Sequence, residues 1–137
     1  MSAVLTLSFL GQTEAALDFY QEVLGCEILY LMRFRECPDK SFVKPDNEDL
    51  IFHATFSIYG TEFKASDVGY DEADGPQFEG FAILLNPSSV EQGQVTFGLL
   101  AKQGQVVIPF SESTFTGWYG IVKDKFGLTW KLNIPKT

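Results

Sequence analysis

In the first 67 residues of this 137-residue chain, apolar and polar positions follow the periods of a strand, a helix and three further strands. Residues 4–10 form a short apolar run. Apolar residues then recur at helical spacing between Thr13, which offers an N-cap hydroxyl, and Gly25, which favours the left-handed end of a helix. Further strands are predicted at residues 27–34, 50–59 and 62–67, the last two joined as a hairpin at Gly60-Thr61.

The second half repeats this order after a turn-rich acidic segment at residues 69–77. Ser88 and Glu91 form a capping-box pattern that opens a helix ending near Gly104. Gly93 and Gly98 weaken this helix by about 1 kcal/mol each relative to alanine. The strands of this half are predicted at residues 79–85, 105–109, 116–123 and 128–134.

The pattern therefore predicts an α+β fold of two βαβββ modules, at about residues 4–67 and 79–134. Each module is about 60 residues long, which is too short to bury a core well by itself. We therefore expect one domain over residues 1–137. Thirteen Phe, five Tyr and two Trp supply ample bulky side chains for its core.

The formal charge of −8 excludes a nucleic-acid partner, because a phosphate backbone attracts basic patches and repels an acidic surface. There is no Lys/Arg run for a membrane surface, no apolar run long enough to span a bilayer, and no secretory signal at the start. Cys26 and Cys37 have no metal-site spacing and are expected as reduced thiols. We therefore expect a cytoplasmic protein with no membrane partner.

Several segments resemble the vicinal oxygen chelate superfamily of glyoxalases, extradiol dioxygenases and bleomycin-resistance proteins. The helix Ala-Leu-Asp-Phe-Tyr-Gln-Glu-Val-Leu-Gly at residues 16–25 is one of them. The segments 52–54, 58–61 and 66–67, with the tail at 119–133, resemble its PhnB-like branch. The resemblance implies a curved mixed sheet with a concave cavity that binds ligands, and pairing into a homodimer.

The resemblance also locates the places where metal-using members carry four ligands, typically His or Gln and Glu. In this chain those places fall near Leu5, Lys64, Gly80 and Lys131. Leucine and glycine side chains donate nothing, and an ammonium group repels a cation. We therefore expect no metal and no other cofactor. In the alternative, a shifted alignment would leave a partial ligand set of Glu62, Asp67 and His53, with Asp67 expected to be solvated at a strand end.

Period-two alternation places His53, Thr55, Ser57 and Tyr59 on the mixed face of one strand, and Phe52, Ala54, Phe56 and Ile58 on its apolar face. Our candidate ligand-binding residues are His53, Thr55, Lys64, Lys131 and Trp118, and we assign no catalytic residue. All but Thr55 have a structural alternative: the lysines extend to solvent, the histidine is a hydrogen-bonded structural residue, and the tryptophan is a core or dimer contact.

Our leading hypothesis is a PhnB-like protein of unknown specific activity that binds a small molecule in a cavity of a homodimer, without a metal. A separate hypothesis is that Lys64 and Lys131 favour an anionic ligand, such as a carboxylate or phosphonate. One alternative is a metal-dependent lyase or dioxygenase of the glyoxalase or extradiol type. Another is a non-catalytic structural or interaction module. The fold cannot choose among these, since the superfamily carries many chemistries on one scaffold.

Overall fold

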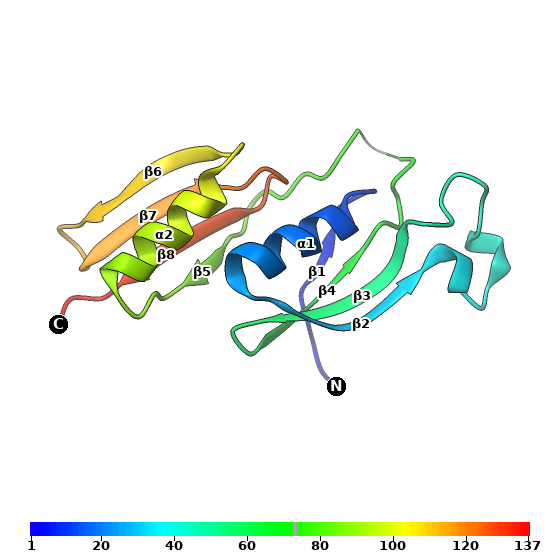
Figure 1. Ribbon diagram of the computed structural model, residues 1–137, viewed down its shortest axis with the longest axis horizontal. Coiled ribbons are helices and arrows are strands. Elements are labelled where there is room, and N and C mark those ends of the chain that lie inside the picture. Colours follow the sequence, from blue (N-terminus) through cyan, green and yellow to red (C-terminus); the bar gives the residue numbers. More distant parts are fainter. Residues whose placement is uncertain (73) are drawn as a thin grey trace. The chain divides into compact units, whose positions relative to one another are not determined.

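The computed structural model describes residues 1–72 and 74–137, and the predicted linker at 69–77 therefore includes one position outside the described residues. The chain divides into two compact units, Met1–Pro76 (unit 1) and Gln77–Thr137 (unit 2). Each unit carries one four-stranded sheet and one α-helix (Figure 1).

Unit 1 has the sheet order β1-β4-β3-β2, with β1 parallel to β4 and the other pairs antiparallel. Its elements are β1 (Thr6–Ser8), α1 (Thr13–Leu24), β2 (Glu27–Arg33), the short 3-10 helices η1 (Phe34–Glu36) and η2 (Lys40–Phe42), β3 (Ile51–Ile58) and β4 (Thr61–Ser66).

Unit 2 repeats this arrangement with the sheet order β5-β8-β7-β6, in which β5 is parallel to β8. Its elements are β5 (Ile83–Leu85), α2 (Val90–Ala101), β6 (Gln105–Glu112), β7 (Trp118–Lys123) and β8 (Thr129–Ile134). The α+β fold class and the two βαβββ modules are confirmed. The eight strands lie in two mixed sheets, one per unit, and the cavity and the single domain stay predictions.

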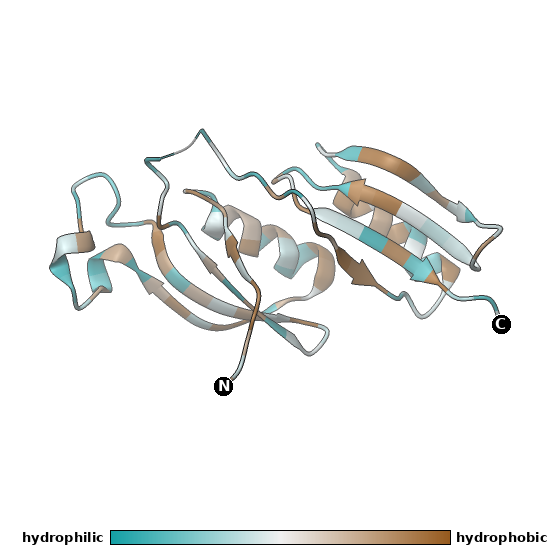
Figure 2. Ribbon diagram, turned by 180° about the vertical axis from the view of Figure 1, so that it is seen from behind, coloured by the Kyte–Doolittle hydropathy of each residue, from teal (hydrophilic) through white to brown (hydrophobic). Residues whose placement is uncertain are grey.

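The apolar stripe of α1 is buried against one face of the unit 1 sheet, and Gly25 ends the helix in the left-handed conformation as predicted. Figure 2 shows how apolar and polar residues alternate along these strands. The buried residues of the helix and sheet are Ala16, Leu17, Phe19, Tyr20, Leu24, Leu7, Ala54, Phe56, Ile58, Phe63 and Ala65.

The predicted apolar face of β3 is wrong at its first position, because Phe52 is half-buried whereas Ile51 is fully buried. Met32 pairs with His53 and Arg33 pairs with Ile51, so Phe52 has no partner on β2. This one-residue β-bulge reverses the alternation at the start of β3. Phe52 instead contacts the rings of Phe34 and Phe42, outside the strand pairing.

In unit 2, two glycines make room for Phe110, Gly93 for its ring and Gly120 for its backbone. A Cβ built on Gly93 of α2 would lie 2.6 Å from Cζ of this ring, and one on Gly120 would lie 2.7 Å from the Phe110 Cα. The ring also stacks on Phe97 of α2 with centroids 5.8 Å apart. Gly93 thus weakens the helix locally but allows close packing on the sheet, whereas Gly98 faces open space.

Several predicted boundaries need correction. The strand predicted at residues 105–109 extends to Glu112, and the helix predicted to end near Gly104 ends at Ala101. The β3–β4 turn is Tyr59-Gly60, where both residues have positive φ, and not Gly60-Thr61. The α2 cap is Ser89, whose hydroxyl accepts a hydrogen bond from the Gln92 backbone, and not Ser88. The strand predicted from residue 79 begins only at Ile83.

Candidate functional site

Parallel strand pairing puts two lysines at equivalent places in the two units. Lys64 on β4 pairs with Thr6 on β1, and Lys131 on β8 pairs with Leu84 on β5. In each case the next residue pair along is buried under the helix, Leu7 with Ala65 and Leu85 with Leu132. Gly80, which was expected at a ligand position of unit 2, lies before β5 and has no strand partner among the described residues. The residue that pairs with Lys131 is Leu84.

Around Lys64, the sheet of unit 1 presents a row of side chains on the face turned away from α1, which we call the open face. The row runs across all four strands in pairing register, through Thr6, Lys64, Thr55 and Tyr30. These residues alternate with the buried ones on β1, β3 and β4, so their side chains share one side of the sheet. His53 lies two residues before Thr55 on β3 and on the same face.

A hydrogen bond fixes the ammonium group within this row. Lys64 Nζ donates to Thr55 Oγ1 over 2.9 Å, and Thr55 is only 7% exposed. Among residues 1–72 and 74–137, no carboxylate lies within ion-pair distance of Lys64. The half-buried ammonium therefore has a neutral partner and retains two N–H donors for an incoming group.

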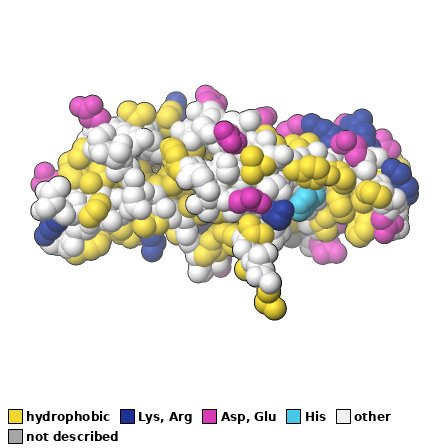
Figure 3. All heavy atoms as spheres, turned by 90° about the horizontal axis from the view of Figure 1, so that it is seen from below, with side chains coloured by type: hydrophobic (Ala, Val, Ile, Leu, Met, Phe, Trp, Pro, Cys, Tyr) yellow, Lys and Arg dark blue, Asp and Glu magenta, His cyan; other side chains and the backbone are white. Residues whose placement is uncertain are grey.

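His53 is half-buried next to this lysine. Desolvation, and secondly the charge of Lys64, lower the pKa of the imidazole below its ordinary value of 6.5. At neutral pH the ring is therefore uncharged and can accept a proton or a hydrogen bond. Figure 3 shows the histidine (cyan) at the surface with basic, acidic and apolar side chains around it.

Tyr30 is a member of the site that the sequence pattern does not identify. Ile28 pairs with Phe56 and Tyr30 pairs with Thr55, so Leu29 is the extra residue of a β-bulge. The Tyr30 ring lies with its centroid 6.1 Å from that of His53, tilted by 53°. A tyrosine on an edge strand is a weak signal, and only the bulge assigns it to the open face.

Acidic residues lie at one end of the same face. Ser57, the next open-face residue of β3, pairs with Glu27 on β2 and with Glu62 on β4. Both glutamates are exposed. The open face thus has an ammonium group, an imidazole and a phenol at its centre and negative charge beyond them.

In unit 2 the surroundings of Lys131 are apolar. Its pairing partners are Leu84 and Ile121, and Ile121 pairs in turn with Ile108 on β6. Trp118 is not brought to this face, because it lies on the same side of β7 as the buried Gly120 and Val122. Its ring contacts Phe110 at 5.3 Å on the α2 side. The structure thus groups His53, Thr55 and Lys64 in unit 1 and separates Trp118 from Lys131 in unit 2.

The residues at the lysine positions do not fit a divalent ion. In unit 1, Thr6 and Lys64 provide one neutral oxygen and one ammonium group, and in unit 2, Leu84 and Lys131 provide one ammonium group alone. An ammonium group repels a cation. Throughout the part of the chain that the structure describes, no group of three or more His, Cys, Asp or Glu side chains could hold a metal ion.

The expectation that Asp67 is solvated is wrong, since this residue is 1% exposed. Its carboxylate accepts hydrogen bonds from the Gly11 and Thr13 backbones, the Thr13 hydroxyl and the Ile51 backbone, at 2.5–3.1 Å. The predicted N-cap at Thr13 is therefore wrong, because Thr13 is the first residue of α1 and its hydroxyl donates to Asp67. The N-cap is Gln12, whose side chain makes no capping hydrogen bond. Asp67 connects β4 to β3 and α1 and has no geometry for a metal.

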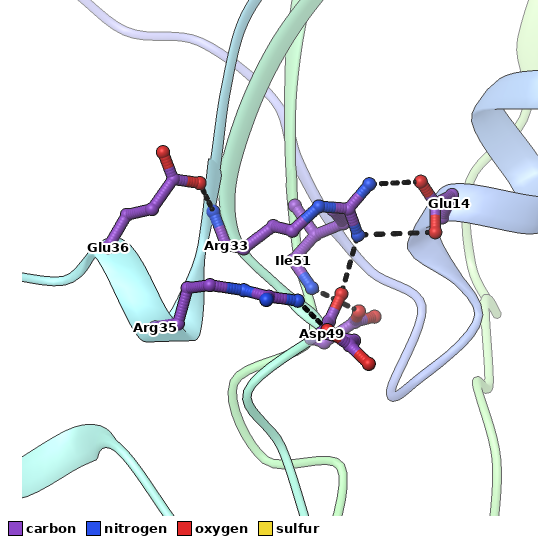
Figure 4. A network of polar contacts seen from close by, with 7 residues as sticks. Glu14, Arg33, Arg35, Glu36, Asp49 and Ile51 are labelled. Atoms are coloured by element: carbon purple, nitrogen blue, oxygen red, sulfur yellow. Dashed lines mark hydrogen bonds and ion pairs between the residues drawn. The ribbon is translucent and has the colours of Figure 1, made fainter.

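A second polar network lies at the far end of β2 and has a structural role. The Arg33 guanidinium contacts both carboxylate oxygens of Glu14 in the first turn of α1, and also donates to the Asp49 carbonyl (Figure 4). Hydrogen bonding to Arg33 lowers the pKa of Glu14 below its ordinary 4.5. Because each charge has its partner within the network, we assign it no ligand.

No helix within the described ranges is long and apolar enough to cross a membrane.

A family model described as 3-demethylubiquinone-9 3-methyltransferase matches residues 2–133 of the chain. Among curated proteins, the chain is similar to protein YjdN of Escherichia coli (strain K12). The two are 31% identical over an alignment of 138 positions, which spans 95% of this chain and 92% of YjdN.

Solved structures give the same picture. The PhnB protein from Bacillus cereus is 25% identical with a TM-score of 0.82, over 98% of this chain and 99% of that one. A protein from Pseudomonas aeruginosa is 26% identical with a TM-score of 0.83, over 100% and 99%. A glyoxalase-related enzyme from Fulvimarina pelagi, 20% identical with a TM-score of 0.65 over 98% and 87%, shares the fold.

Proposed function

The chain belongs to the family described as 3-demethylubiquinone-9 3-methyltransferase, and from that premise we propose that it binds a small anionic molecule on the open face of unit 1, without a metal ion. The observation that carries the proposal is the ammonium group of Lys64, held by Thr55 and without a carboxylate partner among the described residues. A carboxylate or phosphonate oxygen can take up its remaining donors in a charge-assisted hydrogen bond.

The fold supports placing this family in the vicinal oxygen chelate superfamily. The two βαβββ units and the likeness to the glyoxalase-related enzyme agree with the resemblance of the sequence segments. Metal-using members of that superfamily bind substrate oxygens with a cation. At one of the equivalent places in this chain, Lys64 of unit 1 supplies positive charge directly, which keeps the preference for anionic oxygen without the metal.

The proposal does not extend to the methyl transfer named in the family description. A neutral imidazole beside an ammonium group would allow proton transfer on a bound anion, but binding alone is what the contacts support.

The test measures anion binding in the intact protein after chelator treatment. Acetate and methylphosphonate serve as probes, in titrations followed by NMR of the His53 imidazole. Lys64→Met is expected to weaken binding at least about tenfold, which corresponds to one charge-assisted hydrogen bond. Lys102→Met, which removes an exposed charge at the end of α2, is the matched control and is expected to bind normally.

The same titration reads the protonation of His53. Lys64→Met is expected to raise the His53 pKa, because it removes the charge that helps to lower it, while desolvation remains. A bound anion is expected to raise this pKa in the unmodified protein by stabilising the imidazolium. If Lys64→Met leaves anion affinity unchanged, or if binding requires a stoichiometric metal, the proposal is wrong.

We propose in addition that the protein is a cytoplasmic homodimer. Its two cysteines are free buried thiols, as expected for a reducing compartment. The edge strand β6 exposes Val106, Val107 and Ile108 in succession, and an apolar edge of this kind favours pairing with a second copy. Val107→Lys is expected to shift the mass in light scattering from dimer to monomer. Val95→Lys, on the exposed side of α2, serves as the control.

A further inference from the structure

The proposed anion site lies beside a pair of aromatic rings. Tyr30 is the direct pairing partner of Thr55, the residue whose hydroxyl accepts the hydrogen bond from Lys64. His53 lies two residues from Thr55 on the same strand and face. A group bound to the ammonium therefore extends along the sheet against one or both rings.

The geometry of the rings suits a third aromatic ring. Their centroids are 6.1 Å apart and their planes are tilted by 53°, so neither face is covered by parallel stacking of the two. Aromatic rings prefer edge-to-face or offset contacts with centroids about 4.5–7 Å apart. The Tyr30 side chain is 47% exposed, which leaves its face available for such a contact.

The charges on the open face limit where negative charge can lie. Lys64 attracts a carboxylate at the centre, whereas Glu27 and Glu62, both exposed and both paired with Ser57, repel negative charge at the end of the face. A ligand that carries a second carboxylate on its far side would meet this repulsion. The face therefore favours one negative charge per ligand.

We propose that the anion of this site is an aromatic monocarboxylate. Its carboxylate accepts hydrogen bonds from Lys64 Nζ, and its ring packs against Tyr30 and His53. The proposal rests on the proposed function, because it specifies the ligand class of the same site. It adds a ring requirement, carried by Tyr30, to the charge requirement carried by Lys64.

The experiment titrates the full chain by NMR with benzoate, cyclohexanecarboxylate, acetate and terephthalate. Benzoate is expected to bind about three- to tenfold more tightly than cyclohexanecarboxylate, which has equal charge and similar size but no π-system, within the range that ring contacts contribute. Acetate and terephthalate are both expected to bind more weakly than benzoate, since one lacks a ring and the other carries a second charge.

Two variants separate the ring from the charge. Tyr30→Leu is expected to erase the advantage of benzoate over cyclohexanecarboxylate and to keep acetate binding. The control Tyr59→Leu changes an exposed tyrosine at the β3–β4 turn and is expected to leave that advantage intact.

The outcomes distinguish this inference from the function beneath it. If all four anions bind equally, or if Tyr30→Leu leaves the benzoate preference intact, the aromatic inference is overturned while Lys64-dependent anion binding stands. If no anion binds, or if Lys64→Met has no effect on any of them, the proposed function fails and the inference fails with it.

Discussion

Asp67 holds three elements of unit 1 together, and its replacement by alanine provides a quantitative test of the structure. The carboxylate lies 2.8 Å from the Gly11 backbone nitrogen, 3.1 Å from that of Thr13 and 2.9 Å from that of Ile51. The Thr13 hydroxyl also donates to it, over 2.5 Å. Asp67→Ala would leave all these donors without their acceptor.

The expected cost follows from burial. The bonds from the backbone of Thr13, its hydroxyl and the backbone of Ile51 are buried, whereas the Gly11 bond is part-buried and its donor can be hydrated. An orphaned buried donor costs about 1–3 kcal/mol, and a water molecule in the vacated space can satisfy some of the donors. We expect a loss of about 3–5 kcal/mol, a large part of the roughly 5–15 kcal/mol typical of a domain.

The assay is urea unfolding followed by far-UV circular dichroism, with free energies from linear extrapolation. Asp67→Asn keeps one acceptor oxygen but turns an amide donor toward a backbone N–H, so an intermediate loss is expected. Asp18→Ala, on the exposed side of α1, is expected to change stability by less than about 0.5 kcal/mol. An Asp67→Ala loss below about 1 kcal/mol would refute the reasoning.

The same experiment tests the single-domain prediction. Both tryptophans of the chain, Trp118 and Trp130, lie in unit 2. If the chain unfolds as one domain, tryptophan fluorescence and circular dichroism report the same unfolding midpoint in urea. Replacing Asp67 in unit 1 then lowers both midpoints by the same amount. Separate transitions would show that the units unfold independently.

Three further predictions follow from single contacts. Gly93→Ala is expected to destabilise unit 2 by about 1–2 kcal/mol, because the added Cβ would overlap the ring of Phe110. Gly98 faces open space, so Gly98→Ala is expected to stabilise the helix by up to about 1 kcal/mol. Urea titrations measure both changes. Equal effects would contradict this packing. The Glu14 pKa is lower in the folded chain than its ordinary 4.5, so the Arg33 pair stabilises fully above about pH 4.5 and loses this contribution as the pH falls through the folded pKa. Arg33→Met is therefore expected to lower stability by at most about 1 kcal/mol at pH 7, since both side chains are partly exposed, and by less at pH 3. A constant difference across that range would contradict the assignment. Burial raises the pKa of the Cys26 thiol to about 11. At pH 8 a thiol reagent is therefore expected to modify it only as fast as the chain unfolds. Rapid modification of the folded chain would show that the thiol is accessible.

The sequence by itself determined the order of the elements, the two repeated modules and most of the residues that face the helices. These properties follow from local periodicity and from turn residues such as Gly25, whose effect does not depend on distant partners. The equivalence of Lys64 and Lys131 followed from the resemblance to the superfamily, and the grouping of His53 with Thr55 followed from alternation along a single strand.

Only the tertiary structure decided the features that depend on register or on distant contacts. The bulge at Leu29 brings Tyr30 to the open face, and the bulge at Phe52 exchanges it with Ile51 in the core. Asp67 reaches the start of α1 from 54 residues away in the sequence, which no local capping pattern can show. A one-residue shift reverses the side of every following side chain, and period-two patterns contain no information about where the partner strand introduces it.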